Sequence, residues 1–165
     1  GASKMRVVCD AGPLIHLARA GHFELLQDLF GRVLIPPAVY QEVAIRGKGE
    51  DGSHELVRAT WIEQRHPRRS SLVAALATFL GSGEAEAIAL AGERPHTLLL
   101  IDETHGRRVA RNMRITIRGT LGILLQGFRA GSVPDLEAAI SRMRERGTWI
   151  ADDLFAAILA ASRRR

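Results

Sequence analysis

The sequence has little cysteine and no long hydrophobic run. A single cysteine, Cys9, excludes an intrachain disulfide and agrees with a reducing compartment. No apolar segment approaches the ~20 residues that a membrane-spanning helix needs, and no signal-like apolar region follows a charged N-terminus. We therefore expect a cytoplasmic protein without membrane contact. Residues 1–4 are expected to derive from the expression vector, which leaves one domain over residues 5–165.

Lysine is also scarce, and arginine carries almost all of the positive charge. The net charge is +5, and Lys4 and Lys48 are the only lysines. Arginine binds phosphate through a planar, permanently charged group, so the composition weakly favours a polyanionic partner. Neither lysine follows a predicted strand, which disfavours a phosphoacceptor receiver domain. The absence of Gly-x-Gly-x-x-Gly after the first strand disfavours a dinucleotide-binding fold.

Short apolar segments alternate with amphipathic ones along the chain. The alternation predicts an α/β domain of three layers, in which helices flank both faces of a central, mostly parallel sheet. The expected strands are 7–9, 32–35, 61–63, 97–101 and 115–117, with 61–63 at an edge. The expected helices are 14–20, 22–30, 37–43, 54–59, 72–80, 84–91, 106–112, 121–128, 132–146 and a last one from Asp152 or Asp153. Ser132 and Asp135 resemble a capping box that would begin the helix over 132–146.

Four carboxylates fall where such a sheet would gather them. Asp10 and Asp102 each follow an apolar strand directly. Glu42 lies on the helix after the second strand, and Glu84 lies in the first turn of the helix before the Asp102 strand. Ligands of open α/β sheets bind at the carboxyl ends of the strands. Carboxylates held together there repel one another, and Mg²⁺ or Mn²⁺ would offset that repulsion with hard oxygen ligation.

Each acid also has an explanation that involves no ligand. Asp10 would cap the following helix, Glu42 would be a solvated surface residue, and Glu84 would favour its helix dipole. Glu103 is either an additional ligand or a loop residue. Glu86 lies two positions after Glu84 and so cannot share its helical face.

Taken in order, these stretches resemble the PIN domain family of metal-dependent ribonucleases, and most closely its VapC-like branch from prokaryotic toxin–antitoxin systems. The matching stretches are 8–14, 35–43, 83–91, 99–102 with 107–110 after it, and 119–122. The resemblance implies that Asp10, Glu42, Glu84 and Asp102 bind one or two Mg²⁺ or Mn²⁺ ions and hydrolyse RNA. It also implies a three-layer PIN fold, a small antitoxin partner and a homodimer.

The sequence departs from the family pattern in two ways. Ala11 and Gly12 stand where a hydroxyl residue is common, and Glu84 stands where aspartate is common. These differences motivate an alternative, a PIN-like module that binds RNA or a partner protein without cutting.

Other residues near Asp102 have two readings each. Arg107, Arg108 and Arg111 either hold an RNA backbone or form a solvated helix face. Thr120 either lines the pocket or caps its helix, and capping is the simpler interpretation. The six histidines follow no ligand spacing and are expected to be surface or loop residues: His16, His22, His54, His66, His96 and His105.

Overall fold

A computed structural model describes residues 5–164, and the expected vector-derived residues 1–4 lie outside the described part. Its centre is one sheet in which every neighbouring pair of strands is parallel, in the order β3-β2-β1-β4-β5. The strands are β1 (Arg6–Cys9), β2 (Val33–Ile35), β3 (Ile62–Gln64), β4 (Thr97–Leu100) and β5 (Thr116–Arg118). The predicted α/β class, the parallel sheet and the edge position of β3 are confirmed.

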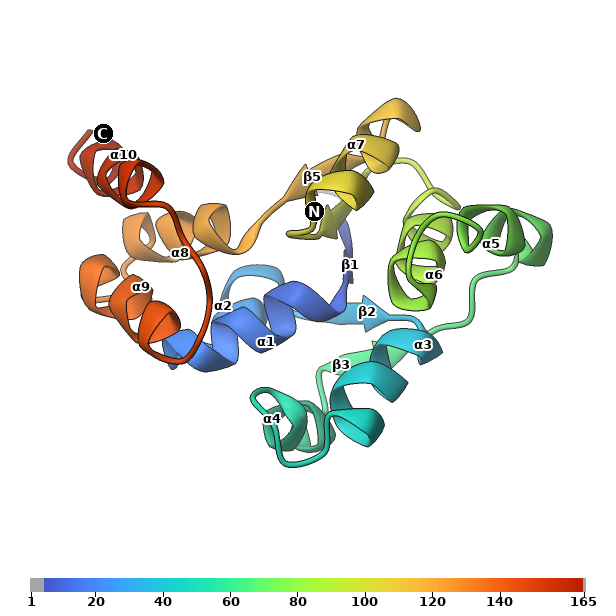
Figure 1. Cartoon of the computed structure of the whole chain (residues 1–165), viewed down its shortest axis with the longest axis horizontal. Coiled ribbons are helices and arrows are strands. Elements are labelled where there is room, and N and C mark those ends of the chain that lie inside the picture. Colours follow the sequence, from blue (N-terminus) through green and yellow to red (C-terminus); the bar gives the residue numbers. More distant parts are fainter. Residues whose placement is uncertain (1–4, 165) are drawn as a thin grey trace.

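Helices cover both faces of the sheet (Figure 1). They are α1 (Ala11–Ala20), α2 (Leu25–Phe30), α3 (Pro37–Tyr40), the π-helix η1 (Gln41–Arg46), α4 (Ser53–Arg58), α5 (Ser70–Leu76), α6 (Ser82–Ala91), α7 (Thr104–Asn112), α8 (Thr120–Arg129), α9 (Leu136–Glu145) and α10 (Asp152–Ser162). Within residues 5–164, no helix is both long and apolar enough to cross a membrane.

The strands are apolar on both faces because each face packs against helices. Successive strand side chains point to opposite sides of a sheet. Val7 and Cys9 therefore join one buried cluster, which includes residues of α1, α2, α8 and α9. Val8 and Leu99 join the other, which includes residues of α5, α6 and α7. These two cores fix β1 and β4 as the central pair of the sheet.

The helix predicted from Ser132 is wrong at its start. Helix α9 begins at Leu136, and its N-cap is Asp135, whose Oδ1 accepts a hydrogen bond from the Ala138 N–H at 3.0 Å. The Ser132 N–H instead donates to the Gly127 carbonyl at 2.8 Å and closes the end of α8. Asp135 directly precedes the first turn of α9 and caps it, whereas Ser132 lies three residues further back, so the capping-box interpretation fails.

Several other helices begin earlier than predicted, and two of these bear on the arrangement of the acids. Helix α1 begins at Ala11, directly after Asp10, and α6 begins at Ser82 with Gly81 as its N-cap. Gly83 therefore lies in the first turn of α6 and is not a break before it. The helix predicted over 37–43 runs on as a π-helix to Arg46, closed by a hydrogen bond from the Gly47 N–H to the Glu42 carbonyl.

Candidate active site

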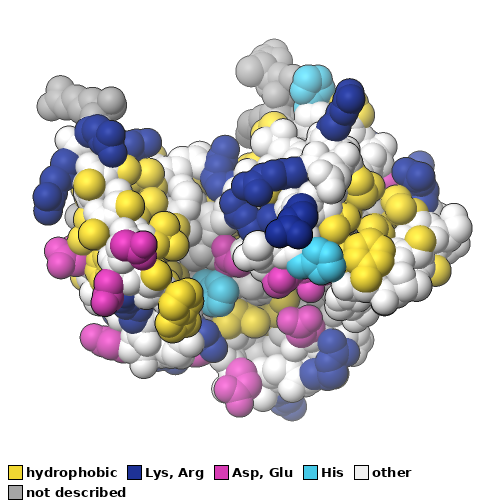
Figure 2. Space-filling view, turned by 45° about the horizontal axis from the view of Figure 1, so that its top comes forward, with side chains coloured by type: hydrophobic (Ala, Val, Ile, Leu, Met, Phe, Trp, Pro, Cys, Tyr) yellow, Lys and Arg dark blue, Asp and Glu magenta, His cyan; other side chains and the backbone are white. Residues whose placement is uncertain are grey.

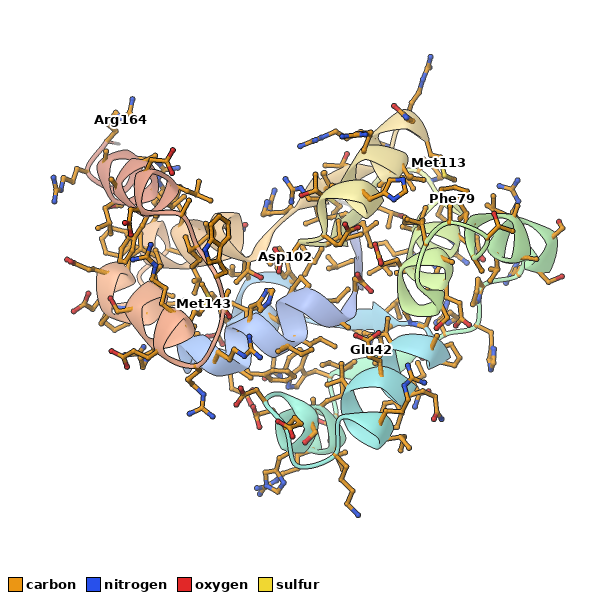
Figure 3. All side chains as sticks on the ribbon, in the orientation of Figure 1. Glu42, Phe79, Asp102, Met113, Met143 and Arg164 are labelled. Atoms are coloured by element: carbon orange, nitrogen blue, oxygen red, sulfur yellow. The ribbon has the colours of Figure 1, made fainter. Side chains whose placement is uncertain are left out.

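A cavity of about 640 Å³ opens at the carboxyl ends of β1 and β4. Asp10 and Asp102 line it because β1 and β4 pair in register, Cys9 opposite Leu100, and each acid follows its strand closely. Figure 3 shows Asp102 and Glu42 near the middle of the molecule. The remaining acids on the lining are Glu42, Glu84 and Glu103. The four acids of the predicted quartet therefore surround one cavity.

Asp10 is the most buried of these acids, with 5% of its surface exposed. It occupies the N-cap position of α1, but its side chain makes no capping hydrogen bond. Burial raises the pKa of its carboxyl to about 7; the Ala11 backbone N–H opposes this shift, and the negative charges of Glu42, Asp102 and Glu103 add to it. Helix capping alone therefore does not account for a carboxylate at this position.

Asp102 is held by hydrogen bonds from two residues. His16 Nδ1 lies 2.7 Å from Asp102 Oδ2, and the Thr120 hydroxyl donates to the same oxygen at 2.6 Å. The Thr120 backbone N–H donates to Oδ1 at 2.7 Å. Burial alone would raise the pKa of Asp102, but these hydrogen bonds outweigh it and the pKa is lowered. Oδ1, which accepts fewer bonds than Oδ2, is the oxygen with capacity left for a ligand.

His16 and Thr120 differ from the interpretations based on sequence. His16 is on α1 and lines the cavity, so the expectation of a surface or loop residue is wrong for it. Its position four residues after Gly12, which also lines the cavity, is the signal that could have identified it. The N-cap of α8 is Gly119, and Thr120 is the first helical residue, so the capping interpretation of Thr120 is also wrong.

Glu84 brings an unsatisfied oxygen into the site. Its Oε2 is buried and, among the described residues, has no hydrogen-bond partner. Burial raises the pKa of Glu84 to about 7; the side chain of Glu103, which can share a proton with it, and the negative charge of Asp10 add to the shift. Gly106 leaves room for this carboxylate, since a Cβ there would lie 2.6 Å from Glu84 Oε2.

Glu103 has a structural partner as well as a place on the cavity wall. It is the N-cap of α7 and accepts hydrogen bonds from the backbone N–H groups of His105 at 3.0 Å and Gly106 at 2.7 Å. Burial would raise the pKa of Glu103, but these bonds, with the Gly106 N–H first, outweigh it and lower the pKa.

Glu42 and Glu86 have different surroundings. Glu42 is exposed in the first turn of η1, at the cavity edge. A Cβ on Gly83 would lie 3.3 Å from Glu42 Oε1 and 3.6 Å from Asp10 Oδ1, so a glycine there lets both acids approach. Glu86 is not on the cavity lining, and its Oε1 accepts a hydrogen bond from the Ala38 N–H at 3.1 Å. Glu86 thus stabilises the start of α3, which precedes η1 and Glu42.

The arginines predicted to contact RNA lie on α7, beside the site. Arg107 is half-buried and donates from Nη1 to the Ile101 carbonyl at 2.9 Å, while Arg108 and Arg111 are exposed. Figure 2 shows a hollow between the part of the molecule that contains α8, α9 and α10 and the part that contains α5, α6 and α7. Basic side chains border this hollow, and acidic side chains lie at its floor. Arg107 is thus anchored beside Asp102, and the other two are free to contact a polyanion.

A family model described as a PIN domain matches residues 6–164 of the chain. The chain belongs to the PIN domain family. No curated protein matches it. PIN domains are generally nucleases that use divalent metals, so the fold is of nuclease type and nucleic acid is its expected partner.

The donors of this PIN domain fit a hard divalent cation. All are carboxylate oxygens, one of them buried without a partner, and two of the acids have a pKa raised to about 7. Within residues 5–164, no three His, Cys, Asp or Glu side chains already converge around one point suited to an ion. Binding an ion therefore requires these acids to lie closer together than they do in this structure.

Helix N-termini surround the same cavity. The first residues of α1 and α8, Ala11 and Thr120, line it, and so do Gly83 and Thr104 at the starts of α6 and α7. The N-terminal end of a helix carries a partial positive charge and free backbone N–H groups. This PIN domain therefore offers a favourable environment to its own carboxylates and to the phosphate of a bound nucleic acid.

Proposed function

We propose that this PIN domain is a metal-dependent ribonuclease that hydrolyses RNA phosphodiester bonds, as the toxin of a VapC-like toxin–antitoxin pair. The observation that carries the proposal is the buried, unpartnered Oε2 of Glu84 in the same cavity as Asp10. An unpaired buried carboxylate oxygen costs free energy, and fold stability gives no reason to keep it. A divalent ion satisfies that oxygen and neutralises its neighbours.

The ion would be held by Asp10 and Asp102, with Glu42 and Glu84 completing its ligands or holding a second ion. When bound, Mg²⁺ or Mn²⁺ supplies an activated water and stabilises the leaving oxygen of the phosphodiester. His16 positions the Asp102 carboxylate from the protein side. Asp10 and Glu84 release their protons when they become ligands, because only the carboxylate form binds a metal.

The chain also supplies groups for the substrate. The helix N-termini around the cavity orient the scissile phosphate through their backbone N–H groups. The exposed Arg108 and Arg111 on α7 contact the RNA backbone. Thr120, whose hydroxyl is bonded to Asp102, acts through that carboxylate and does not hold the RNA directly.

Cleavage of a mixed RNA pool with Mg²⁺ or Mn²⁺ tests the proposal, with EDTA as the metal-free control. Asp10→Asn, Asp102→Asn and Glu84→Gln should each abolish cleavage. Glu86→Gln is the matched control for Glu84→Gln, since it makes the same change on the same helix outside the cavity and keeps an acceptor for the Ala38 N–H. Cleavage that persists in EDTA, or in Asp10→Asn, would contradict the proposal.

A second candidate is a PIN-like module that binds RNA or a protein without cutting. It is favoured by Asp102, whose two oxygens already accept hydrogen bonds from His16 and Thr120, and by the lack of a hydroxyl side chain at Ala11 and Gly12. Folded protein that binds Mn²⁺ in calorimetry and retains RNA, yet cleaves nothing in the pool, would establish this alternative.

The proposed assembly is a homodimer that binds a small antitoxin protein. Light scattering of the purified chain measures the first property, and co-expression with the gene next to its own tests the second. A monomer at all concentrations and the absence of a co-purified small protein would remove the toxin–antitoxin part and leave the ribonuclease part untouched.

A further inference from the structure

The wall of the cavity on the side of α9 and α10 is apolar and carries an exposed tryptophan. Met143, Trp149, Ile150 and Leu154 line the same cavity as the acids. In Figure 1 the lobe of α8, α9 and α10 lies across from the lobe of α5, α6 and α7, and in Figure 2 hydrophobic side chains cover much of the former. Trp149 is 86% exposed, whereas the other tryptophan, Trp61, is half-buried.

The backbone on both sides of Trp149 is held in place. The Arg19 guanidinium donates from Nη1 to the Thr148 hydroxyl at 3.1 Å. On the other side, Arg144 donates from Nη2 to the Ile150 carbonyl. The Thr148 N–H also donates to a carbonyl, that of Met143, at 2.9 Å. The indole is therefore exposed on an anchored segment.

An isolated exposed apolar residue is ordinary, but this one lines a cavity that holds carboxylates. An indole is large and apolar, and it prefers a flat aromatic partner in stacked or tilted contact. Among the components of a nucleic acid, the nucleobase has this shape, and stacking on tryptophan accepts any base because every base has a π-face. A strand whose phosphate lies at the acids brings its bases within reach of the walls of the same cavity.

We propose that Trp149 is the stacking platform for an unpaired nucleobase of single-stranded RNA whose backbone lies at the carboxylates. The inference rests on the proposed ribonuclease function and adds a residue that contacts the bases of the substrate. In a duplex both faces of each base are covered by neighbouring bases. The site therefore selects single-stranded segments or loops over double-stranded RNA.

Tryptophan fluorescence tests the contact directly. In the Trp61→Phe, Asp10→Asn variant, Trp149 is the only tryptophan and the cleavage proposed above is disabled. A single-stranded oligoribonucleotide with Mg²⁺ should quench its emission in a saturable manner. The same strand in a duplex should not quench the emission. Inorganic polyphosphate, which has charge but no bases, should not quench it either. Binding of the single strand by anisotropy without quenching would overturn the inference.

Substitutions of Trp149 give the expected size of the effect. Trp149→Leu keeps an apolar side chain without a π-face and should weaken single-strand binding by about 5- to 150-fold, the usual loss for one base stack. Trp149→Phe keeps the π-face and should retain most of the affinity. Phe79→Leu removes an exposed aromatic ring outside the cavity and is the matched control. A loss there as large as in Trp149→Leu would refute a specific stack.

The outcomes separate this inference from the proposed function. Quenching by single-stranded RNA without any cleavage by the wild type would keep the base site and reject the nuclease. Cleavage with an unchanged KM in Trp149→Leu would keep the nuclease and reject the base site. A change of Trp149 emission when the protein alone is concentrated would mean that a second copy covers the indole, and the inference would fail.

Discussion

Replacing Asp10 by asparagine should stabilise the metal-free protein at neutral and basic pH, although it removes a proposed metal ligand. The pKa of Asp10 rises from 3.8 to about 7 on folding, chiefly because of burial. Asparagine has nearly the same shape and carries no charge, so it keeps the packing and removes the cost of burying a carboxylate.

The sign follows from the protons bound by each state. Below pH 3.8 the carboxyl is protonated in both states and has no effect on stability. Between pH 3.8 and about 7 the unfolded chain releases this proton while the folded protein keeps it, so stability falls as the pH rises. Above about pH 7 both states are ionised and the loss is constant. At ~1.36 kcal/mol per pKa unit, the shift corresponds to about 4 kcal/mol.

Urea unfolding of wild type and Asp10→Asn in EDTA, at pH 4 and pH 8, measures this effect. The free energy of unfolding of the variant, relative to wild type, should increase by about 4 kcal/mol between the two pH values. Any cost of burying the amide is independent of pH and cancels in this comparison. Adding Mg²⁺ at pH 8 should then reduce the difference in free energy of unfolding between the variant and wild type, because the ion binds and stabilises folded wild type.

Asp28→Asn, the same change on an exposed position of α2, is the control for this measurement. A stability difference between Asp10→Asn and wild type that does not change with pH would refute the assignment of a buried, costly carboxylate.

Three further substitutions have defined outcomes. Gly106→Ala places a Cβ 2.6 Å from Glu84 Oε2 and should lower the free energy of unfolding by about 1–3 kcal/mol in urea, with loss of cleavage. An undiminished stability would show that Glu84 moves away at little cost. His16→Ala removes a hydrogen bond that lowers the pKa of Asp102, so the acid limb of the pH–cleavage profile should move to higher pH; an unmoved limb would separate His16 from the reaction. Arg144→Met releases the segment that carries the exposed indole and should speed its amide exchange while the sheet stays protected, and uniform exchange would contradict a local anchor.

The central part of the fold could be predicted because its signals are local in the sequence. Apolar residues on both faces of a short strand require helices on both sides, and this property identifies the strands of Val8 and Leu99. A carboxylate directly after such a strand must lie at the edge of the sheet where ligands bind, which places Asp10 and Asp102. In a parallel sheet all strands run in the same direction, so a residue directly after any strand lies at the same edge of the sheet, and no other contact is needed to place these two acids.

The rest of the site depends on contacts between distant parts of the chain. A threonine at the start of a helix, such as Thr120, is a common capping residue. Its hydroxyl instead donates to Asp102, which is a contact that only the folded structure shows. Glu84 and Glu86 are the same residue type on one helix, and the packing of α3 on α6 gives Glu86 a backbone partner that the sequence does not reveal. The residues on either side of Trp149 accept hydrogen bonds from Arg19 and Arg144, and no local pattern in the sequence reveals these contacts.

The contact between His16 and Asp102 joins residues that are 86 positions apart in the sequence. Thr120, the other residue that holds Asp102, lies 18 positions after it. During translation, Asp10 leaves the ribosome long before the residues that complete its cavity have been made. The pairing of β1 with β4 is a late, non-local step of folding. A chain still being synthesised therefore has no assembled site until translation has passed Asp102 and Thr120.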